Sequence, residues 1–161
     1  MPDRPAEMYR NGRPIIPDFD PNEWLYYRLD PARIQSDGFV DPVSIPCPNL
    51  SSNRQKLSQS WYVLYPRDRF GHWAVYKFQR ETLPPTLQAE GLEATVYTVR
   101  TEHDPHENNY GHCETRLYRG EEAIPAIQAQ VNKHVKNKFR LKFARVITLE
   151  RTAGLPFPPQ A

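Results

Sequence analysis

The sequence predicts an α+β fold in which an antiparallel sheet packs against one C-terminal amphipathic helix, with proline-rich tails. Runs rich in Tyr, Trp, Val and Phe lie at residues 60–80 and 92–119 and are typical of strands. From residue 124 to residue 139, apolar residues recur every three to four positions, as on one face of a helix. Many of the 17 prolines lie near the two ends of the chain.

The 161 residues suffice for one hydrophobic core and are too few for two ordinary domains. Proline removes a backbone donor and biases the preceding residue away from helix. We therefore expect an extended tail over residues 1–22, a single α+β domain over residues 23–151 and a second tail over residues 152–161.

The composition indicates a soluble, cytoplasmic protein. No apolar run has the length of a signal peptide or of a membrane span, so no membrane association is expected. Cys47 and Cys113 are expected to be reduced thiols. The net charge of +2 argues against a surface built entirely to hold nucleic acid, although a local basic patch stays open.

The elements are predicted in chain order. Residues 23–30, "EWLYYRLD", suit a strand or a helical turn, and residues 39–59 are expected to be irregular because prolines interrupt them. Within this segment, Asn53 and Arg54 belong to a polar loop that either wraps an anion or simply connects two elements. Residues 60–80 are predicted to form two strands around the turn "PRDRFG".

Two further strands are predicted, at residues 92–103 and 112–120. The helix should begin near Ala123, with Pro125 in its first turn and Glu121 and Glu122 at its positive end. It then either continues through "RLKFARVITL" or gives way to a last strand.

The connection "HDPHENNYGHCE" at residues 103–114 has three interpretations: a metal site, an acid/base site or a polar loop. His103, His106, His112 and Cys113 are zinc ligand types. Adjacent residues on a strand point to opposite faces, however, so His112 and Cys113 are badly placed to share an ion. Metal is the least favoured interpretation, and we expect neither a metal nor another cofactor.

For acid/base chemistry, the residues that would share one strand face are His112, Glu114, Arg116 and Tyr118. His103 or His106 would be the second proton-transfer group, and such a row could cleave RNA without metal. The alternative is a solvated strand face with paired charges. Asn109 fits a tight turn, and Tyr110 would anchor the loop by packing its ring.

The predicted helix is strongly basic. Its cations could contact nucleic acid or an acidic partner, or they could form an ordinary solvated face. The candidate binding residues on it are Lys133, Lys136, Lys138 and Arg140.

The pieces "YYRLDP", "NLSSNRQKLS", "GHWAVYKF" and "HDPHENNYGHCETR" resemble those of a group of short uncharacterised prokaryotic proteins, over about residues 24–119. This resemblance implies that Asn53, His103, Asn109 and His112 belong to one site. A weaker resemblance links "LYYRLD" to the arginine-bearing first strand of ADP-ribosyltransferase-like folds, but the serine strand and the late glutamate of those folds have no clear counterpart here.

We expect a small binding or accessory protein that acts with a larger protein partner, in a prokaryotic defence or conflict system. The alternative is a metal-independent ribonuclease or toxin that uses His103 and His112, oriented by Glu114 and Arg116. The accessory role is favoured because the sequence shows no compact catalytic motif.

Overall fold

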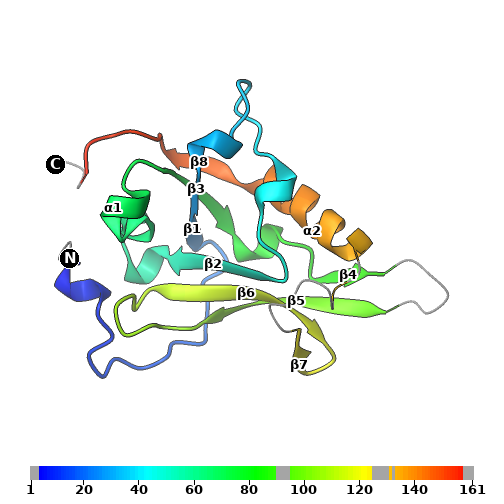
Figure 1. Ribbon diagram of the computed structural model, residues 1–161. Coiled ribbons are helices and arrows are strands. Elements are labelled where there is room, and N and C mark those ends of the chain that lie inside the picture. Colours follow the sequence, from blue (N-terminus) through cyan, green and yellow to red (C-terminus); the bar gives the residue numbers. More distant parts are fainter. Residues whose placement is uncertain (1–3, 90–94, 125–130, 132, 158–161) are drawn as a thin grey trace.

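The computed structural model describes residues 4–89, 95–124, 131 and 133–157. Its main feature is a curled antiparallel sheet, a half-barrel, with one main helix, α2, packed on it (Figure 1). The strands are β1 (Trp24–Leu29), β2 (Asn49–Arg54), β3 (Ala74–Gln79), β4 (Thr86–Gln88), β5 (Val96–His103), β6 (His112–Arg119), β7 (Glu122–Ala123) and β8 (Thr148–Arg151). The helices are α1 (Arg67–Phe70), α2 (Lys133–Val146) and the 3-10 turns η1 (Ala6–Met8), η2 (Pro31–Arg33), η3 (Pro42–Ser44), η4 (Gln55–Leu57), η5 (Ser60–Leu64) and η6 (Arg80–Thr82). The predicted antiparallel sheet and C-terminal helix are confirmed.

The strand order is β4-β5-β6-β2-β1-β3-β8, with β7 beside β6. The predicted strands at residues 92–103 and 112–120 are present as β5 and β6, which form a long hairpin. β1 and β2 pair only through Leu25 with Arg54 and Tyr26 with Asn53. Past these pairs they run in clearly different directions, so the sheet splits between them (Figure 1).

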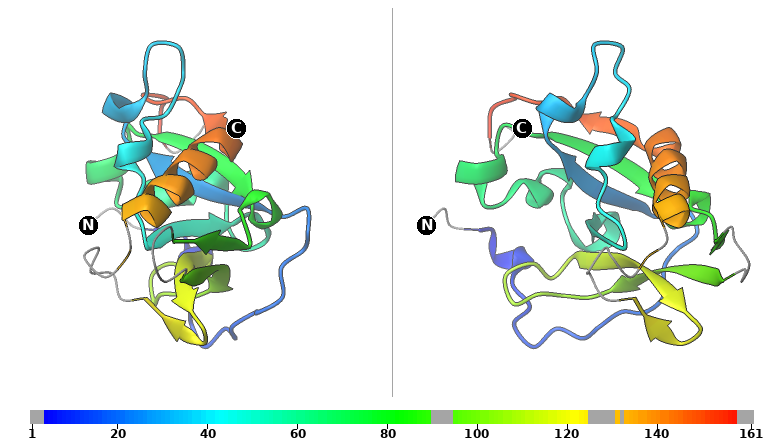
Figure 2. Two further views of the ribbon diagram at one scale, coloured as in Figure 1. Left: turned by 90° about the vertical axis from the view of Figure 1, so that its right-hand side faces the viewer. Right: turned by 45° about the vertical axis from the view of Figure 1, so that its right-hand side comes forward.

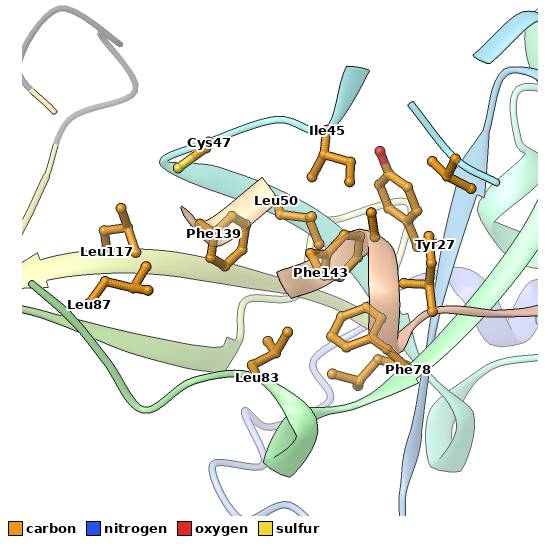
Figure 3. Packing of buried hydrophobic residues seen from close by; sticks show 14 of the residues in the cluster. Tyr27, Ile45, Cys47, Leu50, Phe78, Leu83, Leu87, Leu117, Phe139 and Phe143 are labelled. Carbon is orange, nitrogen blue, oxygen red and sulfur yellow. The ribbon is translucent and has the colours of Figure 1, made fainter. Parts of the chain in front are cut away.

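The main core lies between the sheet and α2, which crosses one sheet face (Figures 2 and 3). Phe143 makes edge-to-face contacts with Tyr27 and Phe78, at centroid distances of 5.4 and 4.9 Å. The predicted periodicity is confirmed at Val135 and Phe139, which are buried. The helix continues through residues 140–146 and the chain then forms β8, so each of the two alternatives is correct for part of this segment. The predicted helix start near Ala123 is wrong, because Glu122 and Ala123 form β7 beside β6, and the predicted helical positions 125–130 lie outside the described residues.

Residues 60–64 are not a strand, contrary to the prediction, but the 3-10 turn η5. Both edges of β3 are already paired, one with β1 and the other with β8, so a strand before β3 has no edge to join. η5 instead places Val63 and Leu64 on the sheet face opposite α2, against Tyr26 and Val75.

Residues 49–54, expected to be part of an irregular loop, form the central strand β2 between β1 and β6. Ser52, Asn53 and Arg54 are buried, and each has a polar partner: Ser52 Oγ lies 3.1 Å from Cys113 Sγ, Asn53 pairs with Asn109, and Arg54 pairs with Glu23. A strand with one apolar core residue, Leu50, is therefore stable in the middle of the sheet.

The N-terminal residues 4–22 contain the turn η1 and no strand, and they are held against the sheet. Arg54 donates hydrogen bonds to the carbonyls of Ile16 and Asp18, at 2.6 and 2.7 Å. Tyr110 donates its hydroxyl to the carbonyl of Pro14, at 2.7 Å. Near the other end, Phe157 packs edge-on against Trp61.

Candidate functional site

A cleft opens where β1 and β2 separate. Its volume is about 760 Å³, which lies in the range of small-molecule and cofactor sites. The arginines that line it come from β1, η2, α1 and the N-terminal segment: Arg28, Arg33, Arg69 and Arg4. Facing groups come from β2 and from the connection between β5 and β6: Asn53, His106, Asn109 and His112.

Arg28, on β1, is half-buried. Its guanidinium lies over the Phe70 ring, at 3.6 Å from the centroid, and donates to the carbonyls of Val63 and Tyr65. Burial lowers the pKa of Arg28, and the charges of Arg69 and Arg4 lower it further. Within the described residues, none of the ion pairs found involves these three arginines. Asp30 is the acidic residue among those that line the cleft, beside Arg4, Arg28, Arg33 and Arg69, so the described walls carry an excess of positive charge, which attracts anions.

His112, the first residue of β6, has a fixed tautomer. Its Nδ1 lies 2.7 Å from the carbonyl oxygen of Asp104, and a carbonyl only accepts, so Nδ1 carries a proton. Its Nε2 lies 3.3 Å from Glu114 Oε1 and is the atom that can take a proton or bind a ligand. Burial alone would raise the pKa of Glu114, but a hydrogen bond from His112 Nε2, which forms when both ring nitrogens are protonated, a hydrogen bond from Ser51 and the nearby charges lower it.

The loop residues beside His112 extend this polar cluster. The rings of His106 and His112 are stacked, with centroids 3.8 Å apart. Partial burial lowers the pKa of His106, and the charge of His112 lowers it further. Asp104 Oδ2 accepts a hydrogen bond of 2.9 Å from Arg116.

The face alternation that the sequence predicts for β6 is present in the structure. His112 and Glu114 contact each other, Arg116 reaches Asp104, and Tyr118 donates its hydroxyl to Glu102. Cys113 and Leu117 point the other way, into the main core. On this face of β6 each of the four side chains therefore has a polar partner, and among them only His112 lines the cleft.

Asn53 and Asn109 form a reciprocal pair. Each side-chain amide donates to the carbonyl oxygen of the other, at 3.0 and 2.9 Å. The pair joins β2 to the connection between β5 and β6, and so fixes this wall of the cleft. Asn53, Asn109 and His112 are thus brought together.

His103 does not join this group. It pairs with Cys113 in the β5–β6 register and shares the core face of the sheet. Its Nδ1 accepts from the Ile16 amide at 2.9 Å, and its Nε2 donates to the Tyr110 carbonyl at 2.7 Å. Burial lowers the pKa of His103. The structure gives His103 a supporting role in the fold, and the expected pairing of His103 with His112 in one site is not seen.

Two other candidate binding residues, Arg54 and Tyr110, are buried and contribute to the stability of the fold. Arg54 is completely buried and forms a bidentate ion pair with Glu23, with hydrogen bonds of 3.1 and 2.9 Å. Its guanidinium group lies over the Phe19 ring. Tyr110 is 2% exposed. Neither side chain can reach a ligand while the protein is folded.

The helix cations lie apart from the cleft, because none of the cleft-lining residues belongs to α2. Arg140 donates to the Ile45 carbonyl at 2.9 Å and Lys138 contacts the Gln88 carbonyl, while Lys133 is exposed and Lys136 is half-buried. Arg28, Arg69 and Asp104 are not among the candidates that the sequence predicts. The motifs "LYYRLD" and "PRDRFG" contain the two arginines, but nothing local indicates that they meet.

Comparisons with protein families, curated proteins and solved structures give no match for this chain. In the part of the chain that the structure describes, no helix has the length and apolar character to cross a membrane.

Proposed function

We propose that this protein is a binding protein whose cleft holds a nucleotide, either free or as part of a single RNA strand. The observation that carries the proposal is the cluster of Arg4, Arg28 and Arg69, which line the cleft and, in the part of the chain that the structure describes, form no ion pair with a carboxylate. Guanidinium groups match the geometry of phosphate oxygens and bind them through paired hydrogen bonds.

The rest of the cleft suits the remainder of a nucleotide. Its volume of about 760 Å³ is much larger than one phosphate group requires. The half-buried ring of Trp73 lines it, and aromatic faces are the usual stacking partners of bases. Ser51 and Asn108 also line it and offer donors and acceptors for a sugar or a base edge.

The cleft is favoured over the basic helix as the phosphate site. Arg140 on α2 is engaged with the backbone of the η3 region, whereas Arg28 and Arg69 meet in a concave site where low-dielectric walls strengthen charge interactions. A larger protein partner and a role in prokaryotic defence stay predictions from the sequence.

Cleavage of RNA is the less favoured alternative. A metal-independent mechanism needs one group to remove a proton and another to supply one, on opposite sides of the phosphate. His103 lies on the other sheet face, and the His106 ring is stacked on His112 at 3.8 Å instead of across from it. The geometry therefore supports binding better than catalysis.

The test measures the affinity of the purified protein for a short fluorescent RNA strand by anisotropy, and for ADP by calorimetry. Arg69→Glu should weaken binding by at least about tenfold, since it removes a phosphate partner and adds repulsion. The matched control is Arg145→Glu, which makes the same charge change at an exposed position of α2. It should change the affinity by less than about twofold.

The outcomes of this test distinguish a free nucleotide from an RNA strand as the ligand, and binding from cleavage. Binding of both probes would indicate that the cleft takes a free nucleotide, while binding of the RNA alone would indicate that it takes a strand. Equal weakening by the two variants, or no binding of either probe, would overturn the proposal. Shortened RNA on a gel would favour the ribonuclease alternative.

A further inference from the structure

We propose that Asp104, His106 and His112 form a binding site for a divalent transition metal ion of the zinc type. One ligand atom of each side chain lies within 4.8 Å of those of the other two. Two imidazoles and one carboxylate are a common protein ligand set for zinc, with a further position for water or a substrate atom. This site does not depend on the proposed nucleotide binding.

His112 is already oriented as metal-bound histidines are. Its Nδ1–H donates to the Asp104 carbonyl at 2.7 Å, so the lone pair is on Nε2. In most metal sites, the ligating histidine donates its other ring N–H to a carbonyl or carboxylate in this way. The Asp104 backbone thus orients one ligand while the Asp104 side chain supplies another.

The Asp104 carboxylate is also held in place. Arg116 donates to its Oδ2 at 2.9 Å, which leaves Oδ1 for an ion. Hydrogen-bonded ligating carboxylates are usual in metal sites. Arg116 is therefore a positioning residue in this proposal.

His106 supplies the adjustable ligand. The residue is exposed on the loop, while one face of its ring is covered by the His112 ring, with an interplanar angle of 29°. Nearly parallel rings do not aim their lone pairs at one point, so metal binding requires His106 to turn off the stack. Its exposure makes that rotation inexpensive.

Glu114 gives a second, independent indication of a cation. Its Oε1 accepts from Ser51 and lies 3.3 Å from His112 Nε2. Its Oε2 is buried and has no hydrogen-bond partner in the described part of the chain. A buried carboxylate oxygen without a partner is costly, and an ion on His112 Nε2 would give it a nearby positive charge.

This proposal replaces the ligand set considered from the sequence. There, metal was least favoured because His112 and Cys113 point to opposite faces of a strand. In the structure the two side chains do point to opposite faces, because Cys113 is completely buried in the main core whereas His112 lines the cleft. Asp104, from the turn, takes the place that Cys113 cannot fill.

The test uses the chelator-stripped full chain, titrated with Zn²⁺ alone by calorimetry and analysed for bound zinc after dialysis. We expect one ion per chain, a shift to higher thermal stability, and X-ray absorption showing nitrogen and oxygen ligands without sulfur. His106→Ala should weaken Zn²⁺ binding by at least about tenfold. Because His106 is exposed, its replacement should not impair folding, so weaker Zn²⁺ binding would reflect the loss of a ligand. The control is His72→Ala, which removes an exposed histidine outside the cluster and should leave binding unchanged.

Three results would overturn the proposal. They are an absence of saturable Zn²⁺ binding by the native chain, equal weakening by His72→Ala and His106→Ala, and a sulfur ligand in the absorption spectrum. Asp104→Asn keeps the shape of the side chain but removes its charge, and full retention of zinc by this variant would exclude Asp104 as a ligand.

Discussion

The two faces of the β5–β6 hairpin each hold a histidine, and the two histidines are used differently. His103 and His112 are both 5% exposed, and each lies 2.7 Å from a backbone carbonyl of the connection between the strands. The second nitrogen of His103 accepts from the Ile16 amide, whereas that of His112 lies beside Glu114 at the wall of the cleft. The environment of the second nitrogen, and not burial, separates a supporting histidine from a candidate ligand.

The arginines show the same contrast. Arg54 is completely buried on the core face, where Glu23 neutralises its charge. Arg28 is held by backbone carbonyls and by the Phe70 ring, and its charge faces the cleft. Charge that is neutralised inside the protein stabilises the fold, while charge that is not neutralised is available to an anion.

The largest expected effect comes from Arg54→Ala. It leaves the buried Glu23 carboxylate without its partner and should lower the free energy of unfolding by about 3–5 kcal/mol. Urea denaturation followed by circular dichroism measures this loss. The control Arg69→Ala, on the cleft side, should stay within about 0.5 kcal/mol. A loss below about 1 kcal/mol for Arg54→Ala would contradict the assigned role.

A smaller effect is expected for His103→Ala. It leaves the Ile16 amide and the Tyr110 carbonyl without partners and should cost about 1–3 kcal/mol of stability. His106→Ala, at an exposed position on the same connection, should change stability by less than about 0.5 kcal/mol. The same denaturation experiment compares the two, and equal losses would remove the distinction between the hairpin faces.

The smallest expected effect concerns the reactivity of the two cysteine thiols. Burial raises the pKa of Cys113 to about 12 and that of Cys47 to about 11. A raised pKa favours the neutral thiol, and only the thiolate is a good nucleophile. Neither cysteine should react with Ellman's reagent at about pH 8 in the folded protein, and both should react after denaturation. Rapid reaction of Cys113 in the native protein would contradict its burial in the main core.

The sequence predicts the regions of regular periodicity. β5 and β6 alternate apolar and polar residues, and Val135 and Phe139 repeat at helical spacing, so these elements could be found without tertiary information. β2 could not, because Ser52, Asn53 and Arg54 are buried only through partners distant in the sequence. Local patterns do not contain those partners.

The candidate site was predictable to a similar extent. The motif at residues 103–114 drew attention to His106 and His112, and strand alternation placed His112 with Glu114. Asp104 was missed because its position beside His112 depends on the turn, and the arginine cluster was missed because its members come from separate elements that the split sheet brings together.

The most direct test of nucleotide binding in the cleft is a nuclear magnetic resonance titration of the ¹⁵N-labelled protein with ADP and with a short RNA strand. We predict the largest shift changes in the backbone amides of residues 27–29, 51–53 and 106–112 and in the guanidinium signals of Arg28 and Arg69. The amides of α2 should change little. Changes centred on Lys133–Val146, with the cleft residues unaffected, would contradict the proposed binding site.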